Sequence, residues 1–343
     1  MIYLAVAAFP FRAAIPRIEM EQALIEAKNI YKDYPLKKKS LFKKSEVIKA
    51  VRGVSFSLLK DESFGYVGES GCGKSTLSRL LIMLEKPTSG EVLYQRKNMH
   101  KTTKREMKQL REKVQLVLQD PYLSLPSWMK VGDIISDPLN IHRKNMTAGE
   151  KRKKIISVMA EVGLEADAYD RYPLSFSAGQ RQMINIARAI ILDPEIVILD
   201  EAVSALDVSV QAHILNLFSS LKEKRGLSYL LIAHDIGVVR HMCDRVAVMY
   251  LGRIVERGSN EDIFDNPLHP YTQALAAAVP SIEGGLMQED VEVLSGEVPS
   301  PINIPAGCSF RSRCPEAMPV CKTTDPQMVR TSSTHEVECH LFV

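Results

Sequence analysis

The sequence predicts an α/β fold in which short, buried strands are covered by helices. Three runs, over 196–199, 229–233 and 245–250, are almost entirely apolar, as expected for strands buried on both faces of an open sheet. Another apolar run, over 63–67, is followed by a glycine-rich loop and by a helical pattern over 74–84. This order of strand, loop and helix, together with the three runs, indicates the α/β class.

The composition is that of an ordinary globular protein. The 343 residues are 45% hydrophobic and 25% charged, which argues against a disordered chain or a fibrous rod, and the length suits two or three domains. Lys and Arg total 44 against 41 Asp and Glu, a net charge of +3, so we expect no nucleic-acid partner. No window holds 18 consecutive apolar residues, so a role at a membrane would need partner chains.

The two ends of the chain differ from its middle. Residues 1–19 fit no element of the expected fold, and we treat them as an N-terminal extension with Met20 as an alternative start. The extension lacks a basic segment and an obvious cleavage site, which disfavours a secretory signal. Pro267 and Pro270 mark a boundary, after which Pro and Cys become frequent and periodicity fades. We therefore expect a small C-terminal module over 268–343.

The glycine-rich loop matches the phosphate-binding pattern G-x4-G-K-[ST], with a strand before it and a helix after it. Its residues are Gly68, Glu69, Ser70, Gly71, Cys72, Gly73, Lys74 and Ser75. The glycines let backbone amides turn inward to phosphate oxygens, and the following helix adds its positive N-terminal end. We expect Lys74 to pair with the β- and γ-phosphates, Ser75 to bind Mg²⁺ through its hydroxyl, and Thr76 to bond near the α-phosphate.

Two acids end the apolar run over 196–199. We expect Asp200 to hold Mg²⁺, directly or through water. Glu201, one residue further, is expected to polarise the attacking water as general base. Two such acids can merely cap a turn, but the phosphate-binding loop favours the catalytic interpretation.

Further motifs fall into a known order along the chain. They are Gln119-Asp120-Pro121 after the apolar run 114–118, Phe176-Ser177-Ala178-Gly179-Gln180, Ser204-Ala205-Leu206-Asp207, and His234 after the run 229–233. Together with the loop they resemble the motifs of ABC-type ATPases, over residues 24 to about 260. The resemblance implies an ATPase domain over 20–267 with a RecA-like core, an antiparallel β subdomain and a helical signature subdomain over about 120–185.

The resemblance also implies an ATP site shared between two subunits. Ser177, the amide of Gly179 and the adjoining Gln180 would face the γ-phosphate held by the loop of an opposing ATPase subunit, so that dimerisation completes the site. His234 would contact the γ-phosphate and orient Glu201. Gln119 would sense Mg²⁺ and water, and Asp207 would join the two sites across the dimer.

Tyr34 aligns with the aromatic residue that stacks on adenine in this family, and Tyr31 is the alternative. Two positions depart from the family pattern. Ala178 stands where the family has glycine, which adds a methyl group near the nucleotide, and Ala202 replaces the usual proline. Because neither change removes a charged or proton-transferring group, we expect ATP hydrolysis to persist.

The C-terminal residues narrow the resemblance. The segments 266–272, 296–301 and 306–308 are similar to the C-terminal region of oligopeptide and dipeptide importer ATPases. This implies an energy-coupling subunit, peripheral on the cytoplasmic face of the membrane, that works with two permease subunits and, indirectly, with an extracytoplasmic peptide-binding protein. Nickel importers share most of these features and are the alternative.

The last residues contain a cluster of cysteines, Cys308, Cys314, Cys321 and Cys339. Their spacing is not that of paired C-x-x-C zinc knuckles. Four thiolates can hold a 4Fe–4S cluster, which we take as the leading hypothesis, with zinc or reduced structural thiols as alternatives.

Two functions of other kinds are considered. A soluble ABC ATPase of DNA repair would carry long coiled coils between Lys74 and Ser177, for which the chain has no room, and a translation factor would carry two cassettes. A hydrolysis-poor regulatory partner is disfavoured by Glu201 and His234.

Overall fold

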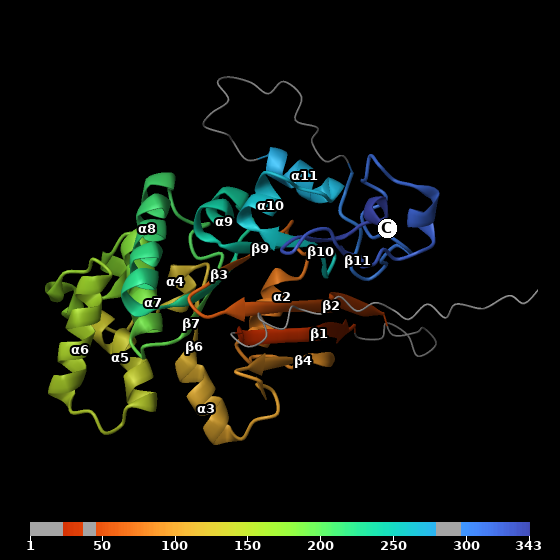
Figure 1. Ribbon diagram of the computed structural model, residues 1–343. Coiled ribbons are helices and arrows are strands. Elements are labelled where there is room, and N and C mark those ends of the chain that lie inside the picture. The colour runs from red at the N-terminus through yellow and green to blue at the C-terminus, as the bar shows by residue number, and fades with distance from the viewer. Residues whose placement is uncertain (1–22, 37–45, 279–295) are drawn as a thin grey trace, which may run out of the picture.

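The computed structural model describes residues 23–36, 46–278 and 296–343 (Figure 1). The proposed extension over 1–19 lies outside the described residues. In the described part, no helix combines the length and the apolar character needed to span a bilayer.

A mixed sheet of eight strands forms the centre of the molecule, in the order β11-β12-β10-β9-β3-β8-β7-β6. Its parallel strands are β3 (Ser63–Val67), β6 (Val114–Val117), β7 (Ile196–Asp200), β8 (Ser228–Ile232) and β9 (Arg245–Tyr250). Every residue of β3 and β8 is buried, because helices or a second sheet cover both faces. The predicted α/β class and the strand positions that the apolar runs indicated are confirmed.

A second, antiparallel sheet packs beside the phosphate-loop helix, in the order β2-β1-β4-β5. Its strands are β1 (Ala23–Pro35), β2 (Val47–Leu59), β4 (Ser89–Tyr94) and β5 (Lys97–Asn98). Phe56 of β2 packs edge-on against Tyr66 of β3 with ring centroids 5.1 Å apart, which joins the two sheets through one apolar core. The antiparallel sheet implied by the family resemblance is therefore present.

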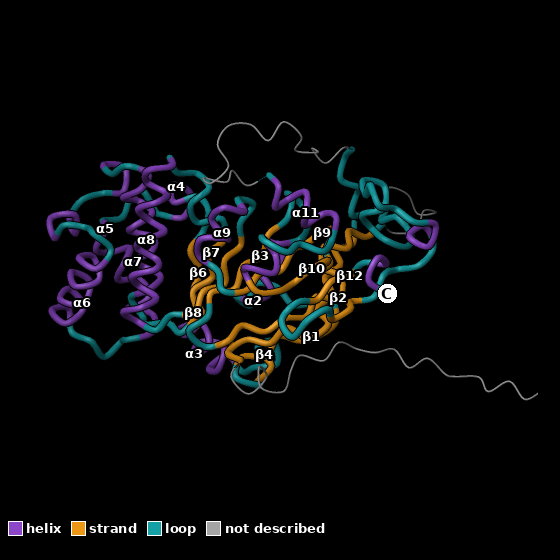
Figure 2. Tube along the Cα trace, turned by 45° about the horizontal axis from the view of Figure 1, so that its top comes forward, coloured by secondary structure: helices purple, strands orange, loops and turns teal. Residues whose placement is uncertain are grey.

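The helices divide into two groups around the central sheet. Helix α2 (Lys74–Leu81) lies between the two sheets, whereas α5 to α7 form a separate group to one side (Figures 1 and 2). Besides α2, the described helices are α3 (Lys104–Lys113), α4 (Pro121–Ser124), α5 (Val131–His142), α6 (Ala148–Glu161), α7 (Ala178–Ile190), α8 (Val208–Arg225), α9 (Ile236–Met242), α10 (Asn260–Phe264) and α11 (Pro270–Ala277). Short 3-10 turns lie at Ala166–Asp170, Pro173–Ser175, Pro319–Lys322 and His340–Phe342.

The C-terminal segment is attached to the central sheet through three antiparallel strands. They are β10 (Arg253–Ser259), β11 (Met328–Arg330) and β12 (Glu336–Glu338), and β12 pairs with β10. Arg253 forms an ion pair with Glu338, and Phe310 packs against Tyr250 and Tyr271 with ring centroids 5.3 and 5.4 Å apart. The segment therefore shares the core of the main sheet, at the end away from α5 and α6 (Figure 2).

Candidate functional site

Four neighbouring parallel strands bring the predicted catalytic residues to one edge of the central sheet. The phosphate loop follows β3, His234 comes after β8, Asp200 ends β7, and Gln119 comes after β6. Because parallel strands end at the same edge, residues far apart in the sequence meet there. This edge is our candidate nucleotide site.

The backbone of the phosphate loop needs its glycines. Gly68, Gly71 and Gly73 have φ of +153°, +80° and +111°, a region that side chains rarely adopt. A Cβ added to Gly73 would lie 2.2 Å from the carbonyl oxygen of Ala50, and one added to Gly68 would lie 2.2 Å from that of Met249. Two of the glycines are thus required both by conformation and by close backbone approach, while Gly71 is required by conformation alone.

Lys74 lies curled inside the loop, with only 5% of its surface exposed. Its ammonium donates to the carbonyl oxygens of Gly68 at 2.5 Å and Glu69 at 3.1 Å. The thiol of Cys72 lies 3.7 Å from the same ammonium, and burial raises the pKa of this thiol. The loop therefore surrounds one cation, with Ser70 and Ser75 exposed at its rim.

Asp200 is tied to the helix that follows the loop. Ser78 Oγ donates to Asp200 Oδ2 at 2.8 Å and to the carbonyl of Ser75 at 3.0 Å, which places the carboxylate beside the first turn of α2. Burial raises the pKa of Asp200, and the Ser78 hydrogen bond opposes that rise. The sequence reasoning missed Ser78, although its position one helical turn after Lys74 places it on the same face.

Glu201 follows with φ of +50°, which is unusual for a residue with a side chain. The N–H of Glu201 donates to the carbonyl oxygen of Ile232 at 2.8 Å. The carbonyl oxygen of Glu201 accepts from the N–H of Ser204 at 3.2 Å and from its Oγ at 3.0 Å. His234 Nδ1 lies 3.6 Å from Glu201 Oε2. The two side chains that the sequence indicated would act together are neighbours.

Tyr34, at the end of β1, lies next to the loop helix. Its hydroxyl donates to Glu85 Oε2 at 2.6 Å and also hydrogen-bonds Thr76. Burial, aided by Glu85, raises the pKa of this tyrosine. Tyr31, in contrast, lies against Gly53 of β2. The contact with Thr76 favours Tyr34 over Tyr31 as the residue near a bound base.

The motif Phe176-Ser177-Ala178-Gly179-Gln180, from here on the signature motif, leads into α7, the signature helix. Ser177 Oγ accepts from the N–H of Gln180 at 3.3 Å while Gln180 Oε1 accepts from the N–H of Ser177 at 3.1 Å, so the two residues form a capping box. Ser177, Ala178 and Gln180 are exposed, and Gly179 is buried so closely that an added Cβ would lie 2.5 Å from Val210. The N-terminus of α7 is therefore capped by its own side chains, with Ser177, Ala178 and Gln180 at the surface.

The remaining predicted residues are also accessible. Gln119 is exposed before α4, and Asp207 is exposed at the N-terminus of α8. Gln182 of the signature helix donates to the carbonyl of Ala202 at 2.7 Å. This contact, which the sequence did not reveal, links the signature helix to the residue that follows Glu201.

The C-terminal cysteines are free thiols that lie in one region. The pKa of Cys308 is raised mainly by burial and further by the nearby thiols of Cys321 and Cys339. Burial and neighbouring thiols also raise the pKa of Cys314, to about 11. Within residues 23–36, 46–278 and 296–343, however, no group of three or more His, Cys, Asp or Glu side chains is placed to hold a metal ion. As they stand, the four thiols do not fit a metal cluster, and the iron–sulfur hypothesis gains no support here.

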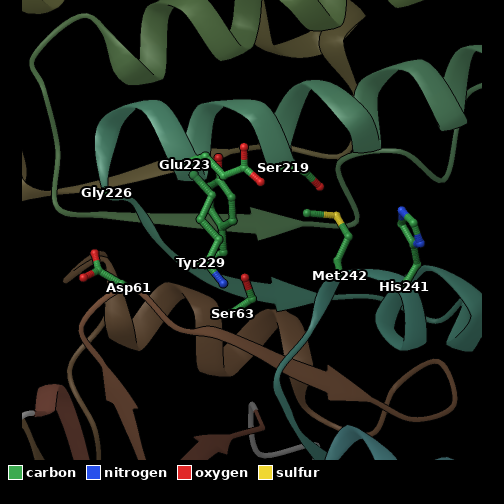
Figure 3. Close-up of a pocket in the computed structure, with 9 residues that line it drawn as sticks. Asp61, Ser63, Ser219, Glu223, Gly226, Tyr229, His241 and Met242 are labelled. Atoms are coloured by element: carbon green, nitrogen blue, oxygen red, sulfur yellow. The ribbon is translucent and has the colours of Figure 1, made fainter.

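A pocket of about 570 Å³ lies at the opposite edge of the sheet, where β3 and β8 begin (Figure 3). Figure 3 shows Ser63 of β3 facing Ser219 and Glu223 of α8 across it. Its lining residues are Asp61, Ser63, Ser219, Lys222, Glu223, Gly226, Tyr229, His241 and Met242. The predicted site residues are not among them, so this pocket is separate from the nucleotide edge.

Solved structures with the same fold include nucleotide-binding proteins. The chain matches cbiO1 from Clostridium perfringens, part of the ABC transporter complex cbiONQ, with a TM-score of 0.61 at 25% identity over 72% of this chain and 92% of that chain. It also matches the ATP-binding cassette MJ0796, in a dimeric structure bound to ADP and Pi, with a TM-score of 0.61 at 27% identity over 69% and 98% of the two chains. The ABC ATPase fold is therefore confirmed.

Family models and curated relatives agree with the fold. Residues 51–204 match the ABC transporter family, and residues 255–321 match the oligopeptide/dipeptide transporter C-terminal region. The dipeptide transport ATP-binding protein DppF of Haemophilus influenzae is 48% identical over 92% of this chain and 96% of its own length. The oligopeptide transport ATP-binding protein AppF of Bacillus subtilis is 46% identical over 94% and 98%. The chain belongs to the ABC transporter family, within the group that carries the oligopeptide/dipeptide transporter C-terminal region.

Proposed function

We propose that this chain is the ATP-hydrolysing, energy-coupling subunit of an ABC importer for dipeptides or oligopeptides. The observation that carries the proposal is the convergence of the phosphate loop, Asp200, Glu201 and His234 at one edge of the sheet, in a chain that also has the oligopeptide/dipeptide transporter C-terminal region. Relatives named as dipeptide or oligopeptide transport ATP-binding proteins, covered over nearly their whole length, support the peptide substrate.

Each site residue receives a proposed role. The loop amides, Lys74 and Thr76 bind the phosphates of ATP, and Tyr34 packs against adenine. Ser75, Asp200 and Gln119 supply the oxygen donors that Mg²⁺ prefers. Ser78 hydrogen-bonds both Ser75 and Asp200, and the closeness of these two residues fits such an ion. When bound, Mg²⁺ neutralises charge on the phosphates.

Hydrolysis needs a base beside the γ-phosphate. Glu201 takes a proton from the attacking water, a role typically worth about 10²–10⁴ in rate. His234, 3.6 Å away, orients the Glu201 carboxylate and contacts the γ-phosphate.

The second half of the site comes from another ABC ATPase subunit. Ser177, Gly179 and Gln180 start a helix whose positive N-terminal end suits a γ-phosphate. Asp207 stands exposed at the N-terminus of α8, whose Val210 lies against Gly179. Val208, next to Asp207, leaves 84% of its surface exposed. An apolar residue that packs at a subunit interface is exposed in this way when one chain is viewed alone. Because these contacts to ATP exist only in the closed pair, ATP favours closure.

Two permease subunits are the proposed membrane partners. Large apolar side chains are exposed just after Gln119, namely Tyr122 (59%), Leu123 (83%) and Trp128 (78%). Exposed apolar side chains of this size suit a protein interface, and their position after Gln119 in the chain links them to the nucleotide edge. We therefore place the chain peripherally on the cytoplasmic face of the membrane, with an extracytoplasmic binding protein that selects the peptide.

Two finer assignments are proposed separately. We divide the chain into an ATPase domain over 20–267, with its helical subdomain over about 120–185, and a C-terminal module over 268–343.

We also keep a 4Fe–4S cluster on Cys308, Cys314, Cys321 and Cys339 as a hypothesis, because the thiols lie in one region, although their placement would have to change. Iron and sulfide analysis after anaerobic purification decides it, and an iron-free protein would reject it.

The transport proposal is tested in vesicles that contain the permease and the ATPase subunits, with the peptide-binding protein added on the opposite side of the membrane. We expect that ATP on the side of the membrane that carries the ATPase subunits drives uptake of a radiolabelled dipeptide. We expect Lys74→Ala to abolish this uptake. Uptake of Ni²⁺ without peptide would favour the nickel alternative. ATP hydrolysis that never responds to the permease would favour a soluble ATPase instead.

A further inference from the structure

We propose that Arg313 and Tyr271, two residues of the C-terminal region, are positioning residues for the phosphate loop. Both hold Glu69, the second residue of that loop, from outside the segment 51–204 that matches the ABC transporter family. The proposal rests on the proposed ATPase function and adds the C-terminal region to its nucleotide site.

Arg313 grips the Glu69 side chain with two parallel hydrogen bonds. Its Nη1 donates to Glu69 Oε2 at 2.6 Å, and its Nη2 donates to Oε1 at 2.9 Å. The Arg313 side chain is only 4% exposed, whereas that of Glu69 is 28% exposed. A bidentate, charge-assisted pair with one partner shielded from water is among the stronger polar contacts in a protein. These hydrogen bonds raise the pKa of Arg313, which keeps the guanidinium charged.

Tyr271 holds the backbone of the same residue. The hydroxyl of Tyr271 accepts a hydrogen bond from the N–H of Glu69 at 2.9 Å, and the side chain is fully buried. The Glu69 amide is therefore directed toward the C-terminal region, and the Glu69 carbonyl accepts from the N–H of Cys72 within the loop at 3.3 Å. Side chain and backbone of one loop residue are fixed from two different C-terminal positions.

The two contacts depend on one aromatic cluster. The ring centroid of Tyr271 lies 4.8 Å from that of Tyr250 and 5.4 Å from that of Phe310. The N–H of Arg313 donates to the carbonyl of Phe310 at 2.9 Å, and the Arg313 guanidinium also contacts Tyr250. The packing of the C-terminal segment on β9 thus sets where Arg313 and Tyr271 stand.

This arrangement prepares the loop for ATP but takes no part in proton transfer. A loop fixed before binding loses less conformational freedom when ATP arrives, so it binds more tightly. Loss of either contact should weaken ATP binding by about ten-fold, within the range of one hydrogen bond. The rate with saturating ATP should change little, because Glu201 and His234 follow other strands, β7 and β8.

The test compares full-length variants Arg313→Gln, Arg313→Lys and Tyr271→Phe with the unchanged protein. The dissociation constant of a fluorescent ATP analogue is measured first, then KM and kcat for ATP. Arg253→Gln is the matched control, because it breaks ion pairs with Asp325 and Glu338 in the same C-terminal segment without touching the loop. We expect raised KM with nearly constant kcat for Arg313→Gln and Tyr271→Phe, a smaller effect for Arg313→Lys, and an unchanged KM for Arg253→Gln.

A double variant shows whether Arg313 acts through Glu69. If it does, Glu69→Gln combined with Arg313→Gln should weaken binding no more than Glu69→Gln alone. Additive effects, an unchanged KM in both Arg313→Gln and Tyr271→Phe, or an equal effect of Arg253→Gln would overturn the inference. If the unchanged protein, paired with a second ATPase subunit, binds ATP without hydrolysing it, the proposed function fails, and the binding constants still decide the inference.

Discussion

Ser78 Oγ donates a 2.8 Å hydrogen bond to Asp200 Oδ2 and so joins the phosphate-loop helix to the strand that carries the two acids. The hydrogen bond opposes the effect of burial, which raises the pKa of Asp200. Because Mg²⁺ binds an ionised carboxylate, this hydrogen bond favours the binding-competent form of Asp200, our proposed Mg²⁺ ligand, at lower pH.

Ser78→Ala should therefore move the acidic limb of the pH–activity profile to higher pH. Without the hydroxyl, the pKa of Asp200 rises further, and a larger fraction of the carboxyl is protonated at any acidic pH. We expect apparent Mg²⁺ affinity to fall about two- to ten-fold, the worth of one hydrogen bond. ATPase rates measured against pH and Mg²⁺ check this. Ser219→Ala, which removes a hydroxyl bonded only within α8, is the control and should leave the profile in place.

Replacing Glu201 by Gln should separate binding from hydrolysis. The amide keeps the shape of the side chain but cannot take a proton, so ATP should bind normally while turnover falls by about 10²–10⁴. Equilibrium binding and ATPase assays measure the two effects. Glu223→Gln, on the opposite edge of the sheet, serves as comparison. Normal turnover in Glu201→Gln would reject the general-base role.

The glycines of the phosphate loop should differ in their tolerance of alanine. At Gly71 an added Cβ meets nothing within 4 Å. Gly71→Ala should therefore lower the free energy of unfolding only through its positive φ, by about 1–2 kcal/mol. At Gly73 the Cβ would also meet the Ala50 carbonyl at 2.2 Å, which should add about 1–3 kcal/mol. Urea unfolding of both variants tests the order, and equal stability of the two would contradict it.

Glu338 should make the C-terminal segment sensitive to pH. Burial raises its pKa from 4.5 to about 7, even though Arg253 pairs with it. Between these values the unfolded chain has already released the proton that the folded chain keeps, so stability falls as pH rises through this window. Thermal unfolding from pH 4.5 to 7 should show this fall, and Glu338→Gln should reduce it. A fall of the same size in Glu338→Gln would mean that another group is responsible.

The central strands could be predicted because burial on both faces leaves continuous apolar runs, as in β3 and β8. The positions of the phosphate loop and of Asp200–Glu201 beside the strand ends could be predicted because each motif spans only a few consecutive residues, whereas their chemical roles stay predictions. The strands β11 and β12 have three residues each, too few for a periodic pattern.

Contacts between distant parts of the chain left no local signal. Glu69 and Arg313 are 244 positions apart, and Gln182 meets Ala202 only because α7 packs beside the end of β7. Helix α8 was not predicted, although Ile214, Phe218 and Leu221 recur at helical spacing and are buried. Pairings of this kind are fixed by the tertiary fold, so a single sequence does not display them.

Our central proposal is that one ATP binds between two chains, with the phosphate loop of one chain opposite Ser177 of the other. The most direct measurement is the ATPase rate per molecule over a wide dilution series, with the mass followed by light scattering, for the unchanged chain and for Ser177→Arg. Our account predicts that hydrolysis appears only where the chain associates with a second ATPase subunit, and that Ser177→Arg abolishes it. Full-rate hydrolysis by a strictly monomeric Ser177→Arg protein would contradict the account.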